Sequence, residues 1–154
     1  ALRYPRGGQD EVLAALGCSG RDYDVYQGGG PAKTALVTYG AETKEALEAV
    51  RRAQKEGQPV DLYKLTVLNP LPDGLAETLG RYEHVVFAEE GVRSGGIGEH
   101  LAAALLEDGA QCSYVHVGLP NTGVTHATTE QLRAKFSLDA ASLRERLRAK
   151  EGTA

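Results

Sequence analysis

The residues with the clearest chemical potential are two glutamates, Glu89 and Glu90, and the glycine-rich loop that follows them. The glutamates end an apolar run at residues 84–88, and the segment Ser94-Gly95-Gly96-Ile97-Gly98 leads into a helical pattern. Carboxylates at a strand end could accept hydrogen bonds or transfer protons, and glycines at a helix start could present N–H groups to a phosphate. In a parallel sheet, sites form at this end of the strands.

Glu89 and Glu90 are adjacent, so on a strand their side chains point to opposite faces and do not form a catalytic pair. Three roles stay open for them: hydration at the strand end, acceptance of loop N–H groups by one of them, and catalysis. The loop matches neither G-x-G-x-x-G nor G-x-x-x-x-G-K-[ST]. We therefore favour a tight turn and close helix–sheet packing as the role of Gly95, Gly96 and Gly98, over phosphate binding.

The other candidates are histidines and arginines. None of the four histidines is spaced from another like a pair of metal ligands. His116 lies in an apolar strand pattern, which favours packing in the core. His126, in the loop after Leu119-Pro120, is the best polar candidate, although a surface or interface role is the simpler interpretation. Arg6, in Arg3-Tyr4-Pro5-Arg6-Gly7, has a guanidinium fork suited to phosphate, but composition alone favours a solvated side chain.

The elements that must position these residues alternate regularly along the chain. Apolar patterns predict strands at residues 23–26, 34–39, 60–65, 84–89 and 112–117. Helical spacing and capping residues predict helices at residues 11–16, 43–55, 72–79, 97–106 and 140–150, and a short one after Thr128. Strands alternating with helices indicate right-handed crossovers and a mostly parallel sheet covered on both faces.

Composition narrows the class of protein. The 154 residues suggest about one domain, and 17 Lys and Arg against 21 Asp and Glu give a net charge of −4. No basic field for nucleic acid is expected, and no apolar run approaches the roughly 20 residues of a membrane span. Cys18 and Cys112, the only cysteines, are expected to be reduced thiols.

The start of the chain suggests that it is part of something longer. It begins at Ala1 without an initiator methionine or an apolar signal segment, and it contains no Met at all. We interpret it as a piece from the C-terminal end of a longer chain. A complete protein processed from a tagged precursor is the alternative.

A set of short motifs occurs in a fixed order. They are Arg3-Tyr4-Pro5-Arg6-Gly7, Leu36-Val37-Thr38-Tyr39-Gly40, Pro70-Leu71, Glu89-Glu90-Gly91, Ser94-Gly95-Gly96-Ile97-Gly98, Gly118-Leu119-Pro120 and the tail from Leu132 to Ala140. Together they resemble the C-terminal domain of the 1-deoxy-D-xylulose-5-phosphate synthase family, in the transketolase superfamily. The resemblance holds from Thr34 to about Leu147. The chain departs from the family pattern at Thr66–Pro72, at Asn121 and at Thr125-His126-Ala127.

The resemblance implies a definite fold and division of the chain. The fold is a three-layer α/β/α domain with a five-stranded, mostly parallel sheet, whose first strand, Tyr23 to Gln27, is antiparallel. Residues 1–30 are then a linker from a preceding pyrimidine-binding domain plus the first edge strand. Residues 31–154 are the transketolase C-terminal-like domain.

The resemblance also implies a function for the full-length protein. Such an enzyme is a transferase that condenses pyruvate with glyceraldehyde 3-phosphate, using thiamine diphosphate and magnesium, for isoprenoid and thiamine biosynthesis. The cofactors are held by the preceding domains, so this fragment is expected to hold no catalytic, cofactor or metal residue and to be inactive alone. Arg6 is implied to contact the substrate phosphate. A cytoplasmic homodimer is expected, with the preceding domains as partners and neither nucleic acid nor membrane.

Other functions stay open from the residues. A close variant is the C-terminal domain of a transketolase or of a 2-oxo-acid dehydrogenase β subunit. Another class is a non-enzymatic α/β module that binds a small ligand, or a purely structural assembly module. A receiver-type module would need acidic residues after its first strand and in mid-domain, and neither Thr38-Tyr39-Gly40 nor Leu62-Tyr63-Lys64 supplies them.

Overall fold

A five-stranded sheet forms the centre of the protein, seen in a computed structural model that describes residues 10–124 and 126–148. The strand order is β1-β3-β2-β4-β5; β1 pairs antiparallel with β3, and all other neighbours are parallel. The prediction of a mostly parallel sheet with an antiparallel first strand is confirmed. The strands are β1 (Tyr23–Tyr26), β2 (Thr34–Tyr39), β3 (Val60–Leu65), β4 (His84–Val92) and β5 (Ser113–Leu119).

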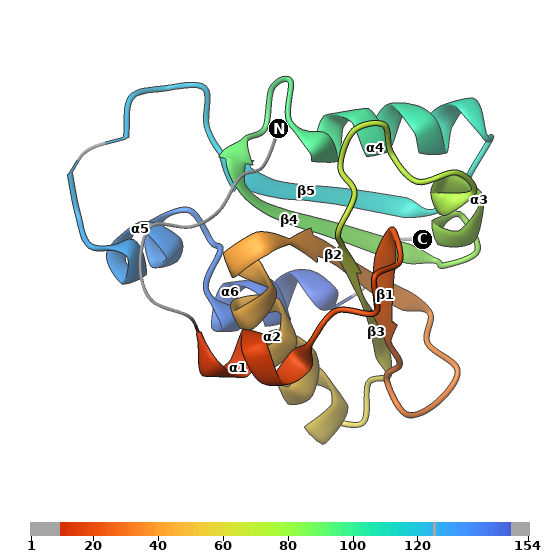
Figure 1. Ribbon diagram of the computed structural model, residues 1–154, viewed down its shortest axis with the longest axis horizontal. Coiled ribbons are helices and arrows are strands. Elements are labelled where there is room, and N and C mark those ends of the chain that lie inside the picture. The colour runs from red at the N-terminus through yellow and green to blue at the C-terminus, as the bar shows by residue number, and fades with distance from the viewer. Residues whose placement is uncertain (1–9, 125, 149–154) are drawn as a thin grey trace, which may run out of the picture.

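Helices cover both faces of this sheet, which gives the three layers expected. Figure 1 shows α3 and α4 along one face and α2 and α6 along the other. The helical elements are α1 (Glu11–Leu16), the 3-10 turn η1 (Gly40–Glu42), α2 (Thr43–Lys55), α3 (Leu75–Leu79), α4 (Ile97–Glu107), α5 (Thr129–Lys135) and α6 (Ala140–Leu147). Within the part of the chain that the structure describes, no helix is long and apolar enough to cross a membrane.

The continuous apolar runs of the central strands are explained by burial on both sides. Leu36 and Val86 pack with α2 and α6, whereas Val37 and Phe87 pack with α3 and α4. All four side chains are fully buried. A strand of a parallel sheet covered on both faces has no solvent side, so the alternation typical of half-exposed strands is lost.

One helix begins later than its sequence suggests. We expected a helix from about Pro72-Asp73, because proline suits a first turn, but α3 begins at Leu75. Gly74 takes a left-handed backbone with φ of 71° immediately before it, and this conformation interrupts a right-handed helix. The turn at residues 72–74 therefore lies outside the helix.

The topology creates a crevice between β2 and β4. The connection after β2 leads to β3 on one side, and the connection after β3 crosses back to β4 on the other side. Such a switch point opens a crevice outside the carboxyl ends of the two strands, where α/β proteins place their sites. Tyr39, which ends β2, and Glu90, near the end of β4, line a pocket at this position, whereas Glu89 is buried.

Candidate functional site

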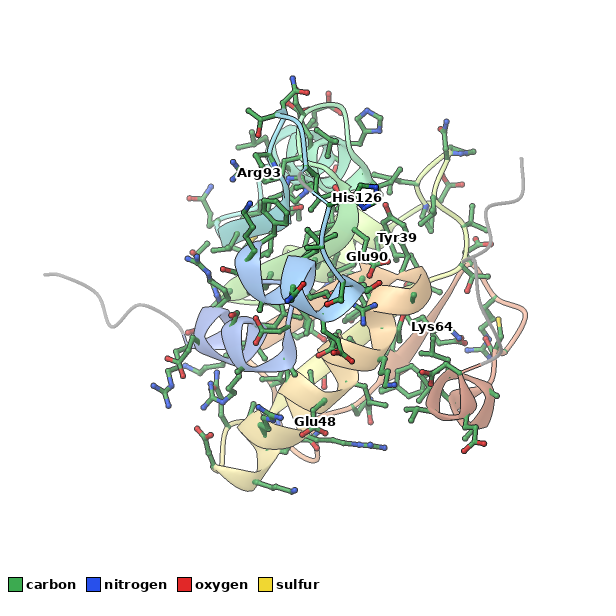
Figure 2. All side chains as sticks on the ribbon, turned by 90° about the vertical axis from the view of Figure 1, so that its left-hand side faces the viewer. Tyr39, Glu48, Lys64, Glu90, Arg93 and His126 are labelled. Atoms are coloured by element: carbon green, nitrogen blue, oxygen red, sulfur yellow. The ribbon has the colours of Figure 1, made fainter. Side chains whose placement is uncertain are left out.

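Glu89 is the centre of a buried hydrogen-bond network at the carboxyl edge of the sheet. Its carboxylate accepts from Tyr39 Oη at 2.8 Å, from His116 Nε2 at 2.7 Å and from the Gly98 backbone N–H at 3.2 Å. Only 1% of the residue is exposed. One carboxylate thus joins β2, β4, β5 and the first turn of α4, and Figure 2 looks onto this edge with Tyr39 labelled.

The hydrogen-bond donors around Glu89 favour the ionised form of its carboxyl group. Burial by itself would raise the pKa of this carboxyl group, but the hydrogen bonds from His116, Tyr39 and Gly98 outweigh burial and bring the pKa below its ordinary value. Glu89 is therefore an ionised acceptor at neutral pH. Because it accepts, His116 Nε2 carries a hydrogen in this arrangement.

The glycines of the loop let the backbone approach this network. A Cβ at Gly96 would overlap the carboxylate of Glu89, and a Cβ at Gly98 would overlap the ring of His116. Gly95 has a positive φ of 74°, and its N–H donates to the side chain of Glu99. The N–H groups of Gly95 and Gly98 thus point at carboxylates of the same chain, an arrangement that leaves them unavailable to a phosphate.

The close approach at Gly96 leads to a direct prediction. We expect Gly96→Ala to lower the free energy of unfolding by about 2 kcal/mol, because the methyl group would collide with Glu89 and with the Val92 carbonyl oxygen. Gly123→Ala is the matched control, since a Cβ there meets nothing within 4 Å. Urea unfolding of both variants checks the prediction, and equal stabilities would contradict it.

Glu90 points away from Glu89 and forms a second cluster. Its Oε1 accepts from Arg133 Nη2 at 2.7 Å and from Arg133 Nε at 3.0 Å, which ties α5 to the end of β4. The same guanidinium lies 3.5 Å from Glu42 and 3.5 Å from Glu45. Arg133 thus forms ion pairs with three carboxylates, of which Glu90 is the closest.

Glu42 is the most unusual member of this cluster. It is 1% exposed, and neither carboxyl oxygen has a hydrogen-bond partner among the described residues. Burial, reinforced by the charge of Glu90 and only partly opposed by Arg133, raises the pKa of Glu42 to about 9. Glu42 is therefore a neutral acid at pH 7.

The structure distributes the expected site residues unevenly. The Gly98 N–H donates a hydrogen bond to Glu89, and Gly96 packs against the Glu89 carboxylate. Glu90 lies in the second cluster, where it pairs with Arg133. His126 is exposed in the loop before α5, and no described residue bonds its side chain; Figure 2 labels it. Arg6 lies outside the described residues.

Four participants were not identified as site residues from the sequence: Tyr39 and His116 in the Glu89 network, and Glu42 and Arg133 in the second cluster. His116 was expected to pack in the core. Its ring does lie edge-on to that of Phe87, with 5.8 Å between the ring centroids, but His116 also hydrogen-bonds to Glu89. Glu42 was not among the candidate site residues. The available signal was the polar His116 in an apolar strand, which pairs in register with Phe87, two residues before Glu89.

These features define an α/β domain with a topological switch point between β2 and β4. At the carboxyl edge of its sheet, buried Glu89 accepts hydrogen bonds from neighbouring strands and from α4. A family model described as the C-terminal domain of transketolase matches residues 30–143. The chain belongs to the transketolase C-terminal domain family. The family resemblance inferred from the motifs is thereby confirmed.

Curated relatives resemble the chain over nearly its whole length. A 1-deoxy-D-xylulose-5-phosphate synthase of Chlorobium phaeovibrioides is 33% identical over 154 residues, covering 96% of this chain and 24% of the relative. The enzyme of the same name from Bacteroides thetaiotaomicron is 32% identical over 155 residues, covering 95% of this chain and 23% of the relative. The chain therefore spans about a quarter of the length of these proteins.

Solved structures agree on the fold. A split gene transketolase, described as an inactive beta4 tetramer, superposes with a TM-score of 0.72 at 27% identity, covering 81% of this chain and 40% of that chain. A 2-oxoglutarate:ferredoxin oxidoreductase from Magnetococcus marinus gives a TM-score of 0.57 at 17% identity, covering 89% of this chain and 21% of that chain. The second likeness is one of fold alone.

Proposed function

We propose that the chain is the C-terminal domain of a thiamine-diphosphate-dependent 1-deoxy-D-xylulose-5-phosphate synthase. The observation that carries the proposal is the identity of 33% over 96% of the chain to an enzyme of that name, of which it covers 24%. The full enzyme would join pyruvate to glyceraldehyde 3-phosphate with loss of carbon dioxide, as a transferase in isoprenoid and thiamine biosynthesis. The domain would supply shape and contact surface.

The Gly95 and Gly98 N–H groups of the glycine loop are already occupied, so this loop is not expected to hold the diphosphate of a cofactor. Thiamine diphosphate needs donors for its phosphates and a magnesium ion needs oxygen ligands, but the N–H of Gly98 faces Glu89 and that of Gly95 faces Glu99. The described residues include no group of three or more His, Cys, Asp or Glu side chains that could hold a metal ion. On the resemblance to the synthase family we assign thiamine diphosphate and magnesium to the preceding domains, and we expect this chain alone to be inactive.

The proposal extends to the surroundings of the domain. Residues 1–30 would connect it to a pyrimidine-binding domain, and residues 31–154 would form the transketolase C-terminal-like unit. The preceding domains and a second copy would be its partners, in a cytoplasmic homodimer. The oligomeric description of the split gene transketolase supports an assembly of copies.

Arg6 is proposed to contact the phosphate of glyceraldehyde 3-phosphate in the full-length enzyme. We expect Arg6→Ala in that enzyme to raise KM for glyceraldehyde 3-phosphate by roughly tenfold or more, because a charge-assisted contact is lost. KM for pyruvate, which has no phosphate, should change little. Steady-state kinetics with both substrates measure this.

Two results would count against these assignments. Equal changes in the KM values for both substrates would contradict the role of Arg6. The control is Arg52→Ala, which removes an exposed arginine that pairs with Glu48 on α2. Failure of the unmodified full-length protein to consume pyruvate in the presence of glyceraldehyde 3-phosphate would contradict the proposed function itself.

The second candidate is the C-terminal domain of a transketolase. The TM-score of 0.72 at 27% identity to the split gene transketolase favours it specifically. Transfer of a two-carbon unit between sugar phosphates, without release of carbon dioxide from pyruvate, would select this candidate. Assaying both substrate pairs on the full-length protein separates the two enzymes.

A further inference from the structure

A pocket of about 480 Å³ opens beside the Glu89 network, between the loop that follows β4 and the loop that follows β5. Arg93 and Ser94 come from the first loop and Asn121 from the second. His116, Tyr114 and Glu99 complete its polar lining. The pocket therefore draws its walls from the loops after β4 and β5, from β5 itself and from α4.

The polar groups of this pocket are available to a ligand. Among the described residues, none forms a hydrogen bond or ion pair with the Arg93 guanidinium, and the same is true of the Ser94 hydroxyl and the Asn121 amide. The Arg93 stem crosses Gly118, where a Cβ would meet its Cγ at 2.9 Å. The glycine in β5 thus allows the cation to lie across the strand at the pocket.

His116 presents a fixed edge to the same pocket. Its Nε2 is bonded to Glu89, and its ring packs on Gly98 and edge-on against Phe87. The other ring nitrogen, Nδ1, has no partner among the described residues.

We propose that this pocket binds a small oxyanion, a carboxylate or a phosphate, through Arg93, Asn121 and Ser94. A planar guanidinium fork pairs with two oxygens of such a group. An amide N–H and a hydroxyl can occupy its remaining lone pairs. Glu99 also lines the pocket, and its carboxylate already accepts a hydrogen bond from the Gly95 N–H.

The site goes beyond the proposed function and does not depend on it, so the 154-residue chain is the right material for its test. Sodium pyruvate and sodium phosphate are titrated separately, with sodium chloride at matched ionic strength as the reference. NMR follows the backbone amides of residues 93–96 and the Cε1 proton of His116. We expect saturable shifts with at least one of the two anions; pyruvate alone indicates a carboxylate ligand and phosphate alone a phosphoryl ligand.

Variants connect the shifts to the pocket. Arg93→Ala is expected to raise Kd by at least about tenfold, and Asn121→Asp should weaken binding as well, because it adds a negative charge. Arg81→Ala, an exposed arginine that pairs with Glu77 outside the pocket, should leave Kd unchanged. The absence of saturable shifts with both anions, or equal affinity in Arg93→Ala, would overturn the proposal.

Discussion

Glu89→Ala is expected to lower the free energy of unfolding by about 3 to 5 kcal/mol, because it removes the acceptor of three donors at once. The Tyr39 hydroxyl, the His116 Nε2–H and the Gly98 N–H all lose their partner. Each donor is buried or half-buried in the folded state but hydrated in the unfolded state. Urea unfolding monitored by far-UV circular dichroism gives the difference directly.

The adjacent glutamate is the matched control for this prediction. Glu90→Ala removes a carboxylate from the same strand, but the Glu90 side chain is 42% exposed and its partner Arg133 keeps Glu45 within 3.5 Å, so a loss of about 1 kcal/mol or less is expected. Glu89→Gln should fall between the two, because it keeps one acceptor oxygen. Equal losses for the two alanine variants would show that the Glu89 network does not stabilise the fold.

Glu42→Gln is expected to stabilise the domain by about 3 kcal/mol at pH 7. The carboxyl group has an ordinary pKa of 4.5 in the unfolded chain and about 9 in the folded protein. Below pH 4.5 the acid is protonated in both states and imposes no penalty. Between pH 4.5 and 9 only the unfolded state loses the proton, so stability falls as pH rises.

The pH profile distinguishes this effect from a general change in packing. The advantage of Glu42→Gln should be near zero at pH 4.5 and should grow up to pH 9, because glutamine has no proton to lose. Glu48→Gln on the exposed face of α2 is the control and should follow the unmodified protein. A constant difference between Glu42→Gln and the unmodified protein across this range would contradict a raised pKa.

The fold could be predicted because its signals are local. Apolar runs such as Leu36-Val37 and Val85-Val86-Phe87 mark strands buried on both faces, and glycines mark the ends of the helices between them. The start of α3 escaped prediction because the left-handed backbone of Gly74 overrides the preference of proline for a first turn.

The site could be predicted only in outline, because it depends on tertiary contacts. The sequence placed Glu89 beside the glycine loop, but nothing near it indicates that Tyr39 and His116 would converge on the same carboxylate. Glu42, just before α2, lies within 3.5 Å of Arg133 of α5, and no local sequence pattern predicts a contact between residues so far apart in the chain.

The order in which the Glu89 network can be completed bears on how the protein is made. The partners of Glu89 extend from Tyr39 to His116, and α6, which begins at Ala140, is needed to close the core on the opposite face. During synthesis, chain segments emerge from the ribosome in order. Among the partners of Glu89, the His116 side chain is therefore the last to be synthesised. A nascent chain halted before residue 116 is expected to be cleaved by proteases more readily than the complete chain.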